Sequence, residues 1–133
     1  MKEEMDVTNR ITVTPDEYGY IDTPSYDKIV ETFGITLASA QQNDYQGDSL
    51  YLLENEGRFG FLKFGWGSCS GCDALEAAQS QKDVDDLQDD LERGINWFDT
   101  REEAMKYIES KVLEDSWLDE RLIADFRAAV ASR

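Results

Sequence analysis

The only two cysteines of the chain, Cys69 and Cys72, lie three positions apart in the segment Gly-Trp-Gly-Ser-Cys-Ser-Gly-Cys-Asp over 65–73. An apolar strand is expected to end here and a helix to begin, and a C-x-x-C pair at a helix start can exchange disulfides, bind a metal ion or shape a tight turn. A thioredoxin-like redox site has this arrangement, in which the helix dipole lowers the pKa of the first thiol. Such sites also place a later cis-proline against the cysteines, whereas Pro15 and Pro24 both precede the pair.

A zinc site is the second interpretation of the pair. Zinc needs four ligands, usually two C-x-x-C pairs or cysteines with histidines, and this chain has one pair and no histidine. Asp73 or Glu76 could complete a site with Cys69 and Cys72, or two subunits could each supply two thiolates. Packing is the third interpretation, because glycine permits positive φ angles in a tight turn and cysteine is commonly buried. The glycines of the segment, together with the missing later proline and the missing zinc ligands, favour packing and leave redox exchange and zinc as alternatives.

Acidic residues are concentrated in one predicted helix over 83–93. The chain has 29 acids against 13 bases, a formal net charge of −16. The helix has no base before Arg93. It contains six of the acids: Asp83, Asp85, Asp86, Asp89, Asp90 and Glu92. The spacing of Val84, Leu87 and Leu91 predicts that the apolar side faces the core, so the carboxylates are expected to cover the solvent side. Like charges four residues apart oppose helix formation by a few tenths of a kcal/mol per pair.

This charge indicates either a protein partner with a basic surface or an adaptation for solubility or for a salty cytoplasm. Nucleic-acid phosphates and anionic membranes repel such a chain, so neither direct nucleic-acid binding nor membrane binding is expected. Carboxylates along a helix can be spaced like DNA phosphates, which follow one another about every 3.4 Å along each strand. The acidic helix is therefore the candidate partner-binding site, and a solvated helix face is the alternative. Trp117, which lies among four further acids, is a candidate aromatic anchor, or else part of the rim of the core.

Several function classes are disfavoured by what the sequence lacks. Without histidine the chain has neither the usual general base nor a Ser-His-Asp, Cys-His or H-E-x-x-H constellation, and no phosphate-binding glycine motif is present. We therefore expect a protein that is not an enzyme and needs no cofactor, with zinc as the alternative. The acidic start of the chain has no apolar core of a secretory signal, and no apolar run is long enough to span a membrane. A cytoplasmic location is expected.

The pattern along the chain predicts one α+β domain over 1–133, with an antiparallel sheet of three to five strands covered by C-terminal helices. The polar residues 1–16 are expected to be frayed or weakly extended. Strands are predicted over 17–22, 35–40, 49–53, 58–66 and 95–98, with the third and fourth forming a hairpin. Helices are predicted from Ser25 to Gly34, over 73–79 and 83–93, after a capping box of Thr100 and Glu103, and over 116–131.

Three blocks of sequence carry a resemblance: Tyr-Gln-Gly-Asp over 45–48, Arg-Phe-Gly-Phe-Leu over 58–62, and Gly-Ser-Cys-Ser-Gly-Cys-Asp-Ala-Leu-Glu over 67–76. They resemble a set of small uncharacterised bacteriophage and bacterial proteins, and Asn-Trp-Phe-Asp over 96–99 is similar too. The resemblance covers roughly 45–110 and implies an accessory role linked to phages, without assigning an activity.

Charge and resemblance together give one function hypothesis. The chain is predicted to be a non-catalytic acidic protein of the host cytoplasm that occupies a basic, nucleic-acid-binding type of surface on a host protein, as inhibitors of restriction or CRISPR enzymes do. The alternative is a small protein whose C-x-x-C thiols, Cys69 and Cys72, exchange electrons or bind zinc.

Overall fold

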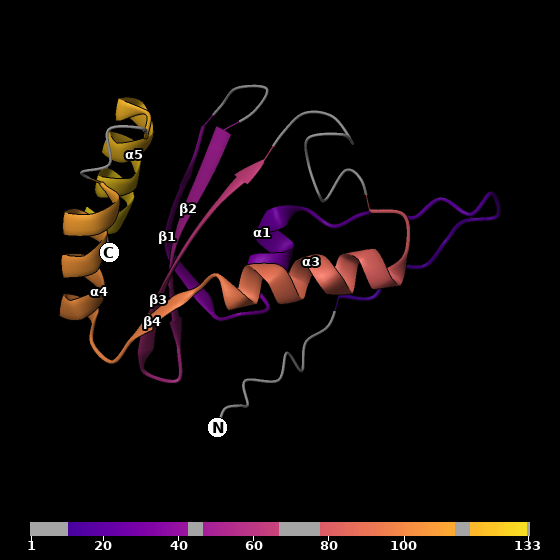
Figure 1. The fold of residues 1–133 in the computed structure, drawn as a ribbon, viewed down its shortest axis with the longest axis horizontal. Coiled ribbons are helices and arrows are strands. Elements are labelled where there is room, and N and C mark those ends of the chain that lie inside the picture. Colours follow the sequence, from indigo (N-terminus) through magenta and orange to yellow (C-terminus); the bar gives the residue numbers. More distant parts are fainter. Residues whose placement is uncertain (1–10, 43–46, 67–77, 114–117, 133) are drawn as a thin grey trace.

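A four-stranded antiparallel sheet lies between two layers of helices in a computed structural model of the chain (Figure 1). The structure describes residues 11–42, 47–66, 78–113 and 118–132. The strands run side by side in sequence order: β1 (Ile35–Gln41), β2 (Gly47–Asn55), β3 (Arg58–Trp66) and β4 (Asn96–Phe98). The predicted single α+β domain with an antiparallel sheet is confirmed.

Helices cover both faces of the sheet. One face carries α4 (Arg101–Tyr107), the π-helical turn η1 (Ile108–Val112) and α5 (Glu120–Ala131). The other face carries α1 (Tyr26–Val30) and α3 (Gln81–Arg93), as Figure 1 shows. The sequence predicted the C-terminal layer, and the structure adds the second one.

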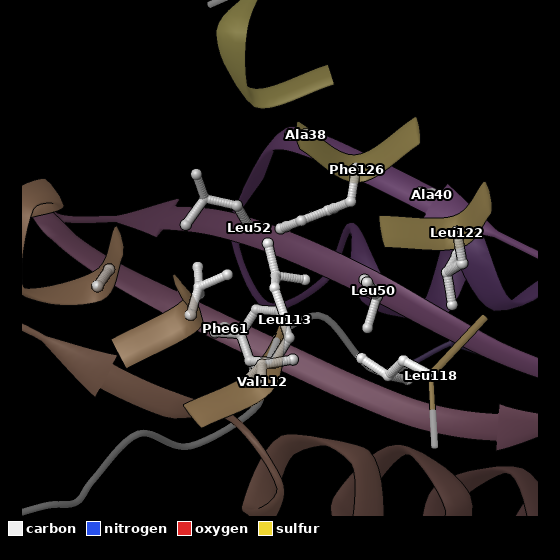
Figure 2. Close-up of a cluster of buried hydrophobic side chains, with 12 residues drawn as sticks. Ala38, Ala40, Leu50, Leu52, Phe61, Val112, Leu113, Leu118, Leu122 and Phe126 are labelled. Carbon is white, nitrogen blue, oxygen red and sulfur yellow. The ribbon is translucent and has the colours of Figure 1, made fainter. Parts of the chain in front are cut away.

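Each face of the sheet has its own hydrophobic core, because side chains alternate between the two faces along a strand. The core under α4, η1 and α5 appears in Figure 2 and contains Ala38, Ala40, Leu50, Leu52, Phe61, Ala104, Ile108, Val112, Leu113, Leu118, Leu122 and Phe126. The core under α1 and α3 contains Ile29, Val30, Phe33, Tyr51, Leu53, Leu62, Leu87, Leu91 and Ile95. The aromatic and apolar residues on both faces of β3 thus mark a strand covered on each side.

The hairpin of β2 and β3 is confirmed. Asn55 pairs with Arg58, so Glu56 and Gly57 form a two-residue turn. Their φ angles are 52° and 83°, the pair of positive values that a type I′ turn requires. The twist of this turn matches that of the flanking strands, which pair over nine registered positions.

The helix ends follow local capping signals. Ser25 caps α1 by accepting a hydrogen bond from the amide of Lys28, and Thr100 caps α4 by accepting one from the amide of Glu103. Both predicted starts are confirmed. The last helix begins at Glu120 rather than at 116, because Asp119 is its N-cap.

The predicted strand over 17–22 is wrong. The chain makes a turn there, flanked by an isolated bridge between Pro15 and Ile21. The side chain of Asp16 accepts hydrogen bonds from the amides of Tyr18 and Tyr20, which bends the backbone where a strand would extend it.

Residues 1–16 were expected to be frayed or weakly extended. Of these, Ile11 and Val13 are held by hydrogen bonds to Gln81 of α3. Residues 1–10 and the predicted helix over 73–79 lie outside the described residues.

Candidate functional site

The acidic helix is α3, and its apolar stripe holds it on the sheet. Val84, Leu87 and Leu91 are buried as predicted. Ser80 caps the N-terminus by accepting a hydrogen bond from the amide of Asp83, and Gly94 ends the helix. Because one side of α3 is fixed against the sheet, its remaining sides carry the six carboxylates.

The carboxylates differ in exposure and in pairing. Three are exposed (Asp83, Asp86 and Asp90), and three are half-buried (Asp85, Asp89 and Glu92). Lys82 Nζ lies 2.7 Å from Asp86 Oδ2, and Arg93 forms a salt bridge with Asp90. The hydrogen bond to Asp86 raises the pKa of Lys82, which keeps that ammonium charged. The helix therefore carries two bases against six acids, rather than the single late base that the predicted boundaries implied.

Two of the six carboxylates stabilise local structure. Asp83 Oδ2 accepts a hydrogen bond of 2.9 Å from the amide of Gln79, ahead of the helix. Asp85 Oδ1 accepts one of 2.9 Å from Gln81 Nε2. Removing either side chain would disturb the start of α3, so these two positions are poor probes of binding.

Two glutamines that the sequence analysis missed hold the segment before α1 against α3. Gln81 Oε1 accepts a 2.8 Å hydrogen bond from the amide of Val13, and Gln81 Nε2 donates one of 2.7 Å to the carbonyl of Ile11. Gln88 is fully buried and donates from Nε2 to Thr32 Oγ1 at 2.8 Å. The signal for Gln88 was its spacing, since it follows Val84 by four residues on the buried stripe.

A buried tyrosine links the sheet to α1. The hydroxyl of Tyr51, on β2, donates a hydrogen bond of 2.6 Å to Asp27 Oδ1. Burial, reinforced by this hydrogen bond and the charge of Asp27, raises the pKa of the Tyr51 phenol well above its ordinary value. The short bond fixes α1 beside α3 on the same face of the sheet.

Replacing Tyr51 by phenylalanine is expected to lower the free energy of unfolding by about 1.5–3 kcal/mol, the range for a hydrogen bond to a charged group. The raised pKa also gives a pH dependence. Above about pH 10 the unfolded state releases the phenol proton while the folded state keeps it, so stability falls as the pH rises. In urea unfolding, the free energy of unfolding should fall more between pH 7 and pH 11 for the wild type than for Tyr51→Phe. Tyr18→Phe, at an exposed position, is the control and should match the wild type.

Among the described helices, the acidic excess lies mainly in the layer of α1 and α3. α3 has six acids and two bases, and the acids of α1 and its C-cap also outnumber their base, two to one. On the opposite layer, α4 and η1 have three acids and three bases, and α5 with its cap has three acids and two bases. One of these pairs, Arg127 with Glu109, joins α5 to η1 at 2.8 Å. The layer of α1 and α3 therefore has the more negative potential.

No protein-family model, curated protein or solved structure matches the chain. The resemblance to phage and bacterial proteins stays a prediction, and the function has to be argued from the surface just described.

The other predicted site residues lie outside the described residues: Cys69, Cys72 and Trp117. Their redox, zinc, packing and anchoring roles stay predictions. Within the part of the chain that the structure describes, no cluster of three or more carboxylates or other metal-binding side chains is placed to hold a metal ion. None of the described helices has the length and apolarity needed to cross a membrane.

Proposed function

We propose that the chain is a non-catalytic acidic protein that binds a basic surface of another protein through α3. The observation that carries the proposal is the concentration of six carboxylates against two bases on one helix, while the helices of the opposite layer are nearly balanced in charge. An acidity that served solubility alone would not require this difference between the helices of the two layers. An uneven field steers a basic partner toward one face.

The charge density of α3 suits a partner that otherwise binds nucleic acid. The acids from Asp83 to Glu92 span ten residues, or about 15 Å of helix at 1.5 Å per residue. Subtracting the two charges neutralised by Lys82 and Arg93 leaves four, about one per 4 Å. A single DNA strand has one charge about every 3.4 Å. The basic groove of a nucleic-acid-binding host protein is therefore the partner class proposed, in keeping with the predicted role in inhibiting restriction or CRISPR enzymes.

Neutralising three acids that have no part in the helix start tests this proposal. The variant Asp86→Asn/Asp89→Asn/Asp90→Asn should bind a fluorescein-labelled nona-arginine peptide roughly 10- to 100-fold more weakly than the wild type. Each substitution makes the surface of α3 more positive by one charge, since removing Asp86 or Asp90 frees Lys82 or Arg93. Two unit charges about 4 Å apart in water interact by about 1 kcal/mol. Fluorescence anisotropy at 50 mM NaCl measures the affinity, and the difference should shrink as salt is added.

A matched variant distinguishes the effect of where the acids lie from the effect of the total net charge. Glu102→Gln/Glu120→Gln/Asp125→Asn removes three exposed acids from the opposite layer, so it has the same net charge as the α3 variant. It should change the affinity by less than about threefold. Equal losses in the two variants would mean that total charge alone governs binding and would contradict the proposed role of α3.

A further inference from the structure

Two tyrosines extend into solvent from the turn that replaces the predicted strand. The side chains of Tyr18 and Tyr20 are 77% and 75% exposed, more than any other large hydrophobic residue in the described part of the chain. Single exposed apolar residues are ordinary on protein surfaces. Here two exposed aromatic residues lie in the same turn, separated only by Gly19. Such a pair can serve as a binding surface, since tyrosine is enriched among the residues that dominate binding energy.

Hydrogen bonds within the turn fix its backbone. Asp16 Oδ1 accepts from the amide of Tyr18 at 2.8 Å and from that of Tyr20 at 3.0 Å. The amide of Asp16 donates to the carbonyl of Tyr20 at 2.8 Å, and Gly19 has the positive φ of 88° that the bend requires. A turn ordered before binding loses less entropy when it meets a partner.

The turn is fixed at the N-terminal end of the acidic helix. Ile21 packs against the cluster of Val13, Ala78 and Val84, and Val84 belongs to α3. Figure 1 shows the turn extending beyond that end of α3. A depression of about 440 Å³ lies at the junction and is lined by Gly19, Tyr20, Ile21, Thr23, Ala78 and Gln79. The turn that carries the two tyrosines thus lies next to the N-terminal end of α3.

The chemistry of the turn points to a cationic ligand. Residues 11–23 include three exposed acids, Asp16, Glu17 and Asp22, and no base. A cation over an aromatic ring is attracted by the electrons of the ring face. Guanidinium fits best, because its plane stacks on a ring while its N–H groups pair with a carboxylate.

We infer that Tyr18 and Tyr20 bind arginine side chains of the basic partner, extending the α3 surface with an aromatic subsite. The inference rests on the proposed function, because both sites would meet the same ligand. The aromatic subsite would also make the protein prefer arginine over lysine, a preference that carboxylates alone do not supply.

The test compares labelled nona-arginine and nona-lysine peptides by fluorescence anisotropy. Tyr18→Ala/Tyr20→Ala should bind nona-arginine about tenfold more weakly than the wild type and nona-lysine only about twofold more weakly. Tyr18→Phe/Tyr20→Phe keeps the ring faces and should bind both peptides as the wild type does. Circular dichroism should show all the variants folded, since both side chains are exposed.

The outcomes separate this inference from the proposed function. The α3 variant should weaken binding of both peptides by a similar factor, because carboxylates attract either cation. If the alanine variant binds both peptides like the wild type, the aromatic subsite is refuted while the α3 surface can still stand. An equal loss in the phenylalanine variant would show that the hydroxyls rather than the rings carry the contact, which also refutes the inference. Failure of the wild type to bind either peptide would refute both proposals.

Discussion

Replacing Phe126 by alanine is expected to lower the free energy of unfolding by about 3–5 kcal/mol, the range for truncating a buried phenylalanine. Phe126 is fully buried in the middle of α5 and meets the ring of Phe61 on β3 edge to face, with ring centroids 6.0 Å apart. Figure 2 shows it in the core between α5 and the sheet. Its loss leaves a cavity and removes one of the two buried side chains that hold α5 on the sheet, so urea unfolding should show a much lower midpoint.

An exposed neighbour on the same helix provides the control. Arg127→Ala removes a surface salt bridge to Glu109, and such pairs contribute about 1 kcal/mol or less. Its unfolding midpoint should stay close to that of the wild type. A loss for Phe126→Ala no larger than that for Arg127→Ala would mean that α5 is not held by the core described.

The parts of the fold that could be predicted from the sequence are those set by neighbours in the chain. The β2–β3 hairpin follows from alternating residues on both sides of a turn ending in glycine, and Thr100 with Glu103 marks the start of α4 within four residues. These signals act over short distances, so one sequence is enough to read them. The inner position of β3 in the sheet agrees with the apolar side chains on both of its faces.

The contacts of the N-terminal segment could not be predicted in this way. Ile11 and Val13 alternate with threonines in a polar stretch, and their partners Gln81 and Gln88 lie 68 to 77 residues later. A glutamine on a helix is most often exposed, and only the assembled fold shows that its amide meets backbone groups of a distant strand-like segment.

The C-terminal end of α4 illustrates a second limit. Ala104, Ile108 and Val112 are spaced four apart, which fits an α-helix, yet the chain widens into the π-helical turn η1, where the amide of Leu113 donates to the carbonyl of Ile108. The wider turn buries Val112 and Leu113 together. Periodicity cannot distinguish the two helices over one turn, because both place a side chain near the core every four or five residues.

The candidate site was predictable in composition but not in arrangement. Six acids and Arg93 on one helix are visible in the sequence, whereas Lys82 pairs with Asp86 only because the helix begins two residues earlier than predicted, at Gln81. The turn that contains Tyr18 and Tyr20 was predicted as a strand, because alternating aromatic residues favour a strand. Asp16 overrides that preference by accepting two backbone hydrogen bonds.

Replacing Gly34 by alanine is the second change with a large expected effect, a loss of about 3 kcal/mol or more in the free energy of unfolding. Gly34 joins the end of α1 to β1 with a φ of 157°, and a Cβ there would lie 2.5 Å from the backbone oxygen of Glu54. That oxygen belongs to β2, so relief would require moving a central strand. The neighbouring link, in which Asn55 Nδ2 donates to the carbonyl of Phe33 at 2.9 Å, would be displaced with it.

Gly94→Ala is the matched control for this substitution. Gly94 follows α3 with an ordinary φ of −83°, and its added Cβ would come no closer than 3.4 Å to its neighbours. The free energy of unfolding should change by about 0.5 kcal/mol or less in urea titrations. Similar values for the two alanine variants would show that the segment between α1 and β1 does not approach β2 as closely as described.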